Sequence, residues 1–261
     1  MFLIGERING TFSDIREALR DKDKTVIQAW VKKQAGADAL DVNAGTGSDK
    51  PVAAMEWLVS AIREISGLPL SIDTTKNDVM EAGLKISGQG RSIINSANAE
   101  PEKLKSSIEL AKKYGAKLIA LTMDRSGVPQ DAGQRVELAG RILIQAQEAG
   151  MNPGDIFIDP ILLPINVAQN QLGEILDAAA QIKLLSDPPC RVILGLSNLS
   201  QKTKFKSLLN RTFLAMAAAR GLDSAILDVT DNGLIDSLAA AELILNRQVY
   251  CDDFTESFRK K

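Results

Sequence analysis

The stretch "LSIDTTKNDVMEAGLK" at residues 70–85 contains one strand followed by one helix. Its first three residues, Leu70 to Ile72, are a short apolar run typical of a buried strand, and residues 76–86 have the apolar spacing of a helix. Asp73 follows at the carboxyl end of the strand, although acids are disfavoured in strands. The stretch therefore predicts a strand–helix unit with a carboxylate at the junction.

This unit recurs along the chain. Seven other short apolar runs, each predicted to be a strand, start at residues 2, 39, 92, 118, 156, 191 and 225. Helical periodicity marks residues 51–66, 76–86, 99–116, 134–149, 172–185, 207–220 and 233–246. Eight strand–helix alternations in about 250 residues predict an α/β protein with one domain over residues 1–261, a (β/α)8 TIM barrel. A doubly wound sheet is the alternative, but no glycine fingerprint follows the first strand.

The composition is that of an ordinary globular protein. The chain has 261 residues, of which 45% are apolar and 25% charged, with a formal net charge of −2. This balance argues against a nucleic-acid partner, which requires a basic surface. No apolar run approaches the ~20 residues of a membrane span, and the amino terminus lacks the features of a signal peptide. We therefore expect a cytoplasmic protein without a membrane partner.

Two scarce residue types restrict the chemistry. The chain has no histidine and only two cysteines, Cys190 and Cys251. An imidazole base, a histidine metal ligand and a Ser-His-Asp triad are thereby excluded, and a cysteine zinc site is not expected. We therefore predict no metal bound by this chain, and any catalysis has to use carboxylates, amides, hydroxyls and a cofactor from elsewhere.

Polar residues mark the carboxyl ends of the predicted strands, where TIM barrels carry their active sites. Because side chains alternate along a strand, Leu70 and Ile72 should face the helices while Ser71 and Asp73 face the barrel axis. The polar residues at these ends are Glu6, Arg7 and Asn9, then Asp41, Asn43, Asp73, Asn95, Ser96, Thr122, Asp159, Ser197, Asn198 and Asp228.

Asp73, Asn95 and Asp159 are the leading candidates for a binding site. Each could instead cap the following helix, but convergence of three strand ends favours a common site. Carboxylates and amides without a nearby cation suit a planar heterocycle rich in N–H donors. A 2-amino-4-oxopyrimidine edge offers a ring N–H and an amine that one carboxylate accepts together, and an asparagine amide satisfies the neighbouring atoms.

Four further residues have two interpretations each. Asp41 and Asn43 either contact the ligand or form a hydrogen-bonded layer that supports it. Glu6 and Arg7 either line the mouth of the barrel or form an ion pair with each other.

Six blocks of the sequence stand out, namely "GERING" (5–10), "DVNAG" (41–45), "IDTTKNDVMEAGLK" (72–85), "IINSAN" (93–98), "FIDPILLP" (157–164) and "LGLSNLSQ" (194–201). In order and spacing they resemble the blocks of the pterin-binding methyltransferases. This family includes methyltetrahydrofolate:corrinoid/iron–sulfur protein methyltransferase and the folate module of cobalamin-dependent methionine synthase. The resemblance spans essentially the whole chain.

The resemblance implies a dihydropteroate-synthase-like barrel in which methyltetrahydrofolate is the substrate. The N5 methyl group would pass between folate and the cobalt of a cobalamin carried by a separate corrinoid protein, such as a corrinoid/iron–sulfur protein. No corrinoid-binding segment is recognisable in this chain, which agrees with a separate carrier. Family members are commonly homodimers, so we expect a homodimer.

The resemblance also implies roles for individual residues. Asp73, Asn95 and Asp159 would hold the pterin ring, and Asn198 would approach N5. Gly195 and Ser197 would shape the loop around Asn198. The remaining implied contacts are Gln201 with the folate or the corrin and Lys206 with the glutamate tail. Glu6, Asp41 and Asn43 are further candidates for the binding site, from their positions at the strand ends rather than from the resemblance.

Catalysis is expected to depend on Asn198, Asp73 and Asp159, because no side chain is an obvious strong acid. Asn198 would hydrogen-bond N5 as positive charge develops there, and the two carboxylates would favour the cationic state. Two other functions remain open. A dihydropteroate synthase needs a lysine- or arginine-bearing block near the seventh strand, where this chain has "LGLSNLSQ". A non-catalytic barrel that binds folate is the second.

Overall fold

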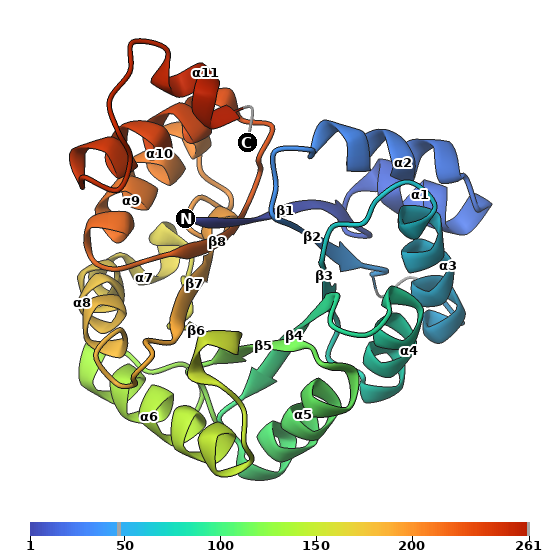
Figure 1. Cartoon of the computed structure of the whole chain (residues 1–261), viewed down its shortest axis with the longest axis horizontal. Coiled ribbons are helices and arrows are strands. Elements are labelled where there is room, and N and C mark those ends of the chain that lie inside the picture. The colour runs from blue at the N-terminus through green and yellow to red at the C-terminus, as the bar shows by residue number, and fades with distance from the viewer. Residues whose placement is uncertain (46–47, 260–261) are drawn as a thin grey trace.

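A computed structural model describes residues 1–45 and 48–259, and within them eight parallel strands close into a barrel surrounded by helices (Figure 1). Neighbours in the barrel follow chain order, and β8 pairs with β1 to close it. The predicted TIM barrel is confirmed. Its strands are β1 (Phe2–Asn9), β2 (Ala39–Asn43), β3 (Leu70–Asp73), β4 (Ser92–Asn98), β5 (Lys117–Leu121), β6 (Ile156–Asp159), β7 (Arg191–Gly195) and β8 (Ser224–Leu227).

Every helical segment expected from periodicity is a helix. These are α3 (Pro51–Arg63), α4 (Asn77–Ser87), α5 (Pro101–Tyr114), α6 (Ala132–Glu148), α8 (Leu172–Ile182), α9 (Lys206–Ala219) and α10 (Asn232–Ile244). Four helices were not predicted, and each is short or follows a helix directly. They are α1 (Ser13–Asp21), α2 (Lys24–Lys33), α7 (Ile165–Ala168) and α11 (Phe254–Arg259).

The outward faces of the strands pack against the helices. Leu70 and Ile72 belong to the large buried cluster that strands and helices share, as the alternation of side chains predicted. The approach is close, because a side-chain carbon at Gly83 of α4 would lie 2.8 Å from Ile72. The helical shell therefore holds β3 in the orientation that turns Ser71 and Asp73 toward the barrel axis.

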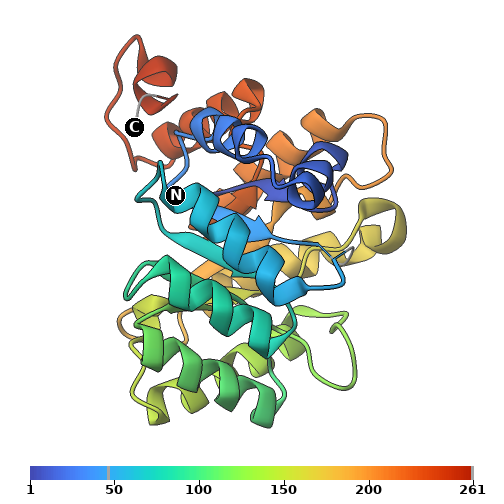
Figure 2. The ribbon, with the colours of Figure 1, turned by 90° about the vertical axis from the view of Figure 1, so that its right-hand side faces the viewer.

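The carboxyl ends of the strands open on one side of the barrel. In Figure 2 the yellow segment that contains α7 and the orange β7–α9 connection both stand out on this side. A backbone hydrogen bond of 2.9 Å from Ile165 to the carbonyl of Leu199 joins these two connections. Within the described residues no helix combines the length and apolar character needed to cross a membrane.

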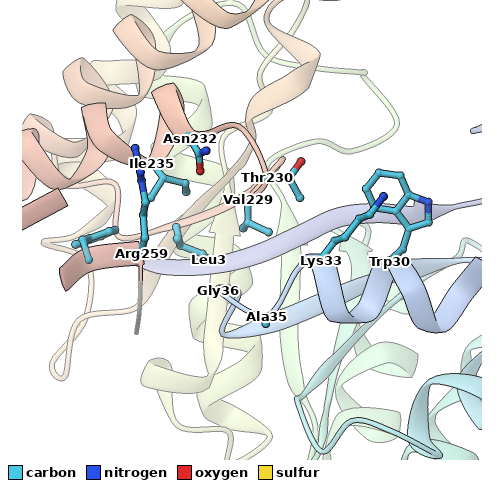
Figure 3. A pocket seen from close by; sticks show the side chains of 11 residues that line it. Leu3, Trp30, Lys33, Ala35, Gly36, Val229, Thr230, Asn232, Ile235 and Arg259 are labelled. Carbon is cyan, nitrogen blue, oxygen red and sulfur yellow. The ribbon is translucent and has the colours of Figure 1, made fainter. Parts of the chain in front are cut away.

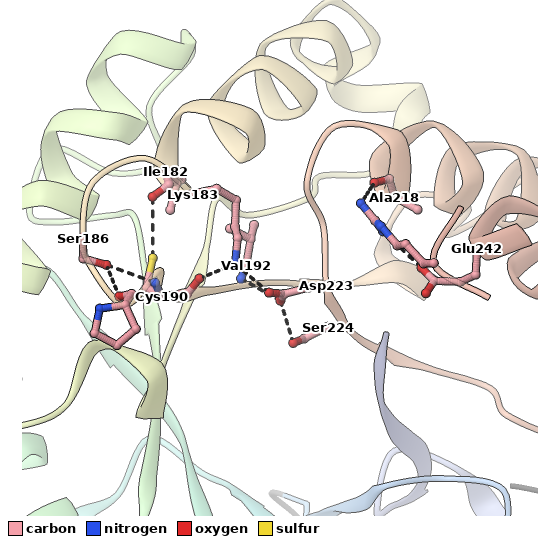
Figure 4. A network of polar contacts seen from close by, with 11 residues as sticks. Ile182, Lys183, Ser186, Cys190, Val192, Ala218, Asp223, Ser224 and Glu242 are labelled. Carbon is pink, nitrogen blue, oxygen red and sulfur yellow. Dashed lines mark hydrogen bonds and ion pairs between the residues drawn. The ribbon is translucent and has the colours of Figure 1, made fainter. Parts of the chain in front are cut away.

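At the opposite end, a polar network around Asp223 joins β7 to β8 (Figure 4). One carboxylate oxygen of Asp223 accepts hydrogen bonds from the Val192 amide and the Ser224 hydroxyl, each at 3.0 Å. The other oxygen accepts the ammonium group of Lys183 at 2.7 Å, and Lys183 also donates to the carbonyl of Cys190 at 2.6 Å. These hydrogen bonds connect the first residues of β7 with the first residues of β8 and stabilise their pairing.

Asp223→Ala should lower the free energy of unfolding by about 2 kcal/mol, because the Lys183 ammonium and the Val192 amide lose a charged acceptor. Urea unfolding followed by circular dichroism measures this change. Glu137→Ala, at an exposed position on α6, is the control and should stay within about 0.5 kcal/mol of wild type. Equal stability of the two variants would contradict the role assigned to Asp223.

Candidate active site

The inner face of the barrel changes from apolar to polar along the strands. Toward the amino ends, a buried cluster that contains Ile4, Ala39, Ile93, Ile119, Phe157 and Ile193 fills the interior. Two positions further along, the same strand faces carry Glu6 on β1, Asp41 on β2, Asn95 on β4 and Asp159 on β6. The apolar cluster thus forms a floor, and the polar side chains form a ring above it toward the carboxyl ends.

Asp41 lies within this ring and is 3% exposed. Its Oδ1 accepts hydrogen bonds from the Ser71 hydroxyl at 2.7 Å and from the Asn95 amide at 3.0 Å. Burial, reinforced by the charge of nearby Asp73, raises the pKa of Asp41 to about 8. Asp41 therefore keeps its proton at neutral pH and supports Asn95 from below.

Asn43 supports Asp73 in a similar way. Its Nδ2 donates to Oδ2 of Asp73 at 2.7 Å, while its Oδ1 accepts the amide of Gly45 at 2.6 Å. Burial raises the pKa of Asp73, and the bond from Asn43 opposes that rise. The structure thus arranges Asp41 and Asn43 as a supporting layer, one of the two arrangements considered from the sequence.

Asp159 stands at the end of β6 in a desolvated position. Its Oδ1 accepts the backbone amide of Ile161 at 2.7 Å, and its carbonyl accepts the Thr122 amide at 2.9 Å. Burial raises the pKa of Asp159 to about 7, against the lowering effect of the Ile161 amide. Ile161 has a φ of 65°, a left-handed conformation that is costly for a β-branched residue. The chain turns sharply here and directs its amide to the carboxylate.

None of the three leading candidates caps a helix. The residues at the cap positions of α4, α5 and α7 are Lys76, Glu100 and Pro164. The capping alternative is therefore wrong for Asp73, Asn95 and Asp159. Each of these residues lies on the inner face of its strand, before the position that caps the next helix.

The suggested Glu6–Arg7 ion pair is wrong as well. Arg7 donates to both carboxylate oxygens of Asp14 at 2.9 Å, and its guanidinium carbon lies 4.1 Å from the centre of the Trp30 ring. Glu6 instead accepts the Ser197 hydroxyl at 2.7 Å. Consecutive residues of β1 point to opposite faces, so Glu6 enters the barrel while Arg7 meets α1 and α2. Burial raises the pKa of Glu6, with a smaller contribution from Asp228.

Asn198 lies exposed in a single 3-10 turn, Leu196–Asn198, directly after β7. Its Oδ1 accepts the side-chain amide of Gln201 at 2.9 Å, which leaves its Nδ2 as the free hydrogen-bonding group. A side-chain carbon at Gly195 would come within 3.0 Å of that Nδ2. Gly195 therefore leaves the room that Asn198 occupies, and Ser197 ties the same turn to Glu6 on β1.

Lys206 is not brought into the ring. It lies exposed at the first position of α9, and no hydrogen bond or ion pair within the described residues joins it to the carboxylates. Two residues of the site were not assigned a role from the sequence. The Ser71 hydroxyl donates to the Asp41 carboxyl group, and the Thr122 hydroxyl donates to the carbonyl of Asp159. Ser71 was detectable, since it shares the inner face of β3 with Asp73.

A cavity lies elsewhere on the molecule, beside the outer face of β1. It has a volume of about 510 Å³, and its lining includes Leu3, Trp30, Val229 and Ile235 (Figure 3). None of its lining residues belongs to the predicted site. Across residues 1–45 and 48–259, no group of three or more histidine, cysteine, aspartate or glutamate side chains is arranged to hold a metal ion.

The fold and the ring of acceptors define a TIM-barrel protein with a polar site at its carboxyl-end mouth. A family model described as "Pterin binding enzyme" matches residues 5–228. The chain belongs to this family, as its sequence blocks predicted.

Relatives of known function are similar over different lengths. A methylcorrinoid:tetrahydrofolate methyltransferase from Eubacterium limosum is 26% identical over 266 residues, covering 100% of this chain and 97% of that protein. A methionine synthase from Mycobacterium leprae is 33% identical over 241 residues, which is 87% of this chain but only 20% of that enzyme. The expected membership of the pterin-binding family is thus confirmed, and the relative that matches over its whole length is a methyltransferase.

Solved structures show the same fold. A dihydropteroate synthase from Yersinia pestis, in complex with a pterine-sulfa conjugate, has a TM-score of 0.65 at 15% identity and covers 94% of each chain. A dihydropteroate synthase from Coxiella burnetii, in complex with pteroic acid, has a TM-score of 0.69 at 15% identity, covering 95% of this chain and 93% of that one. At this identity the likeness extends to the barrel alone.

The raised pKa of Asp41 predicts how stability depends on pH. The folded state binds this proton more tightly than the unfolded state, so the stabilisation is complete below about pH 4 and is lost as pH rises through about 8. Wild type should therefore lose unfolding free energy relative to Asp41→Asn across this range, at up to ~1.4 kcal/mol per pH unit. Urea unfolding at pH 5 and pH 8 measures the difference. Glu137→Gln should instead run parallel to wild type, and a parallel Asp41→Asn would show that Asp41 does not carry this proton.

Proposed function

We propose that this protein transfers the N5 methyl group between methyltetrahydrofolate and the cobalt of a separate corrinoid protein. The observation that carries the proposal is a set of partly buried acceptors at the carboxyl ends of β3, β4 and β6, together with the side-chain amide of Asn198 on the turn after β7. Membership of the pterin-binding family supports the folate half. Similarity over the whole chain to the methylcorrinoid:tetrahydrofolate methyltransferase of Eubacterium limosum supports the corrinoid half.

The pterin ring would be held by Asp73, Asn95 and Asp159. Asn43 occupies Oδ2 of Asp73, and Asp41 holds the amide nitrogen of Asn95. The remaining Oδ atoms of these three side chains are acceptors for the ring N–H and the exocyclic amine of a 2-amino-4-oxopyrimidine edge. An analogue without those donors would leave buried acceptors unpaired and would bind poorly.

Asp159 would change its protonation state on binding. With a pKa of about 7, a large fraction of this carboxyl is protonated at neutral pH. N–H donors of the pterin favour the ionised form, so binding would displace that proton. The displaced proton passes to solvent, and N5 takes up one proton from solvent once its bond to the methyl carbon breaks.

Asn198 would assist the departure of N5. Because Gln201 holds the Asn198 oxygen, the free Nδ2 can donate to the N5 lone pair. Reduced cobalt supplies the electron pair of the new bond to carbon, while the electrons of the broken C–N bond stay on nitrogen. The hydrogen bond from Asn198 strengthens as that electron density returns, which stabilises the transition state more than the bound substrate. From the sequence, the same hydrogen bond was expected to respond to positive charge on N5, and that expectation stays a prediction.

A carrier protein would present the corrin at the open mouth, where the exposed position of Asn198 permits access from outside. Aligning the cobalt with the methyl group supplies part of the rate enhancement. The homodimer, the iron–sulfur character of the carrier and the cytoplasmic location stay predictions.

The proposal is tested by methyl transfer between methyltetrahydrofolate and reduced cobalamin, followed at the absorbance band of the cobalt. We expect a change of the cobalt spectrum that requires both folate and protein. A protein that binds folate without changing this spectrum would be a non-catalytic folate barrel. Condensation of a pterin diphosphate with aminobenzoate would instead identify a dihydropteroate synthase.

Asn198→Ala should lower the single-turnover rate about 10²- to 10³-fold, a loss comparable to that of one oxyanion-hole donor. The dissociation constant of methyltetrahydrofolate should change only a few-fold, because the Asp73, Asn95 and Asp159 contacts remain. Stopped-flow spectroscopy and calorimetry give the two quantities. Asn170→Ala, exposed in the β6–α8 connection, is the matched control and should behave as wild type. If affinity falls at an unchanged rate, Asn198 only binds the substrate.

A further inference from the structure

Arg135 on α6 is a fully buried charged residue that the mechanism above does not use. Its exposed fraction is 0%, and no carboxylate within the described residues lies at ion-pair distance from it. Its guanidinium group donates instead to the Pro160 carbonyl at 2.9 Å, the Asp131 carbonyl at 3.1 Å and Oε1 of Gln171 at 2.8 Å. Burial lowers the pKa of Arg135, and the charges of Asp131 and Glu174, which lie beyond ion-pair distance, oppose this effect only in part. A buried charge whose direct partners are neutral is costly, so its position requires an explanation.

Two of these acceptors belong to the connection after β6. Pro160 directly follows Asp159, and Gln171 ends the short 3-10 helix before α8. The guanidinium therefore holds the connection at both of its ends. The Ile161 amide donates to the Asp159 carboxylate, and this N–H belongs to the same peptide group as the Pro160 carbonyl that Arg135 binds.

The same connection also reaches the turn that carries Asn198. The amide of Ile165 donates to the carbonyl of Leu199, the residue after Asn198. A shift of the β6–α8 connection would therefore move both the carboxylate and the amide of the candidate site. Positions in a binding site have to be held to a fraction of an ångström to preserve affinity.

We propose that Arg135 is a positioning residue, which aims the Asp159 carboxylate at the pterin by clamping the β6–α8 connection to α6. This inference rests on the proposed function, because it assigns Asp159 to pterin binding. Arginine suits this task because its planar group presents several donors in fixed directions. A lysine at position 135 has one flexible ammonium group and cannot reach all three acceptors with that geometry.

Arg63 on α3 provides a matched control. Its guanidinium group also binds backbone carbonyls, those of Ser66, Leu68 and Arg91, together with the Ser87 hydroxyl. These acceptors precede β3 and β4, at the end of the barrel opposite the site. Arg63→Ala thus removes similar bonds without touching the candidate site.

The test compares Arg135→Ala, Arg63→Ala and wild type in full-length protein. Calorimetry gives the dissociation constant of methyltetrahydrofolate, and thermal unfolding gives Tm. We expect both variants to lose Tm, while the dissociation constant rises on the order of tenfold or more in Arg135→Ala alone. Millimolar guanidinium chloride, which can fill the vacated space, should restore affinity to Arg135→Ala and leave wild type and Arg63→Ala unchanged.

A wild-type dissociation constant in Arg135→Ala, or equal increases in the two variants, overturns the inference and leaves the proposed function standing. A wild-type protein that binds no methyltetrahydrofolate overturns both. Should Arg135→Ala fail to fold, Gln171→Leu removes one acceptor of the clamp and keeps the arginine. That variant should bind folate several-fold more weakly at near-normal Tm, and unchanged binding also overturns the inference.

Discussion

The site depends on the desolvation of carboxylates above an apolar floor. Ile4, Ala39, Ile93 and Phe157 fill the barrel interior, and the next inward position on each of their strands is polar. Removal of these acids from water raises their pKa values and leaves each one dependent on a protein or ligand donor. A ligand rich in N–H groups would supply such donors.

Hydrogen bonds within the site decide which atoms remain for a ligand. Asn95 and Asn198 have the same side chain, yet they present opposite ends. Asp41 holds the nitrogen of Asn95 and leaves its oxygen, whereas Gln201 holds the oxygen of Asn198 and leaves its nitrogen. One residue type thus presents an acceptor on β4 and a donor after β7, because the neighbouring side chains differ.

Much of the fold was predictable because its signal is local. Strand runs and helical stripes depend on residues within one element, and eight repeats leave few architectures open. The helices α1 and α2 were missed, because no helical periodicity was identified between the first two strands, where the chain forms two consecutive helices. Of the suggested site residues, Asp73, Asn95 and Asp159 face the barrel as alternation required, while Lys206 stays outside the ring.

The sequence by itself determined the barrel, the inward direction of Asp41, Asp73 and Asp159, and the absence of imidazole chemistry, because periodicity and composition are properties of the chain alone. Tertiary structure decided the partners. Arg7 pairs with Asp14 rather than with Glu6, and Arg135 donates a hydrogen bond to the carbonyl of Pro160, the residue after Asp159. Such contacts join residues from separate strands and helices, and their pairing depends on how the closed barrel and its shell pack together, which spacing along the chain does not encode.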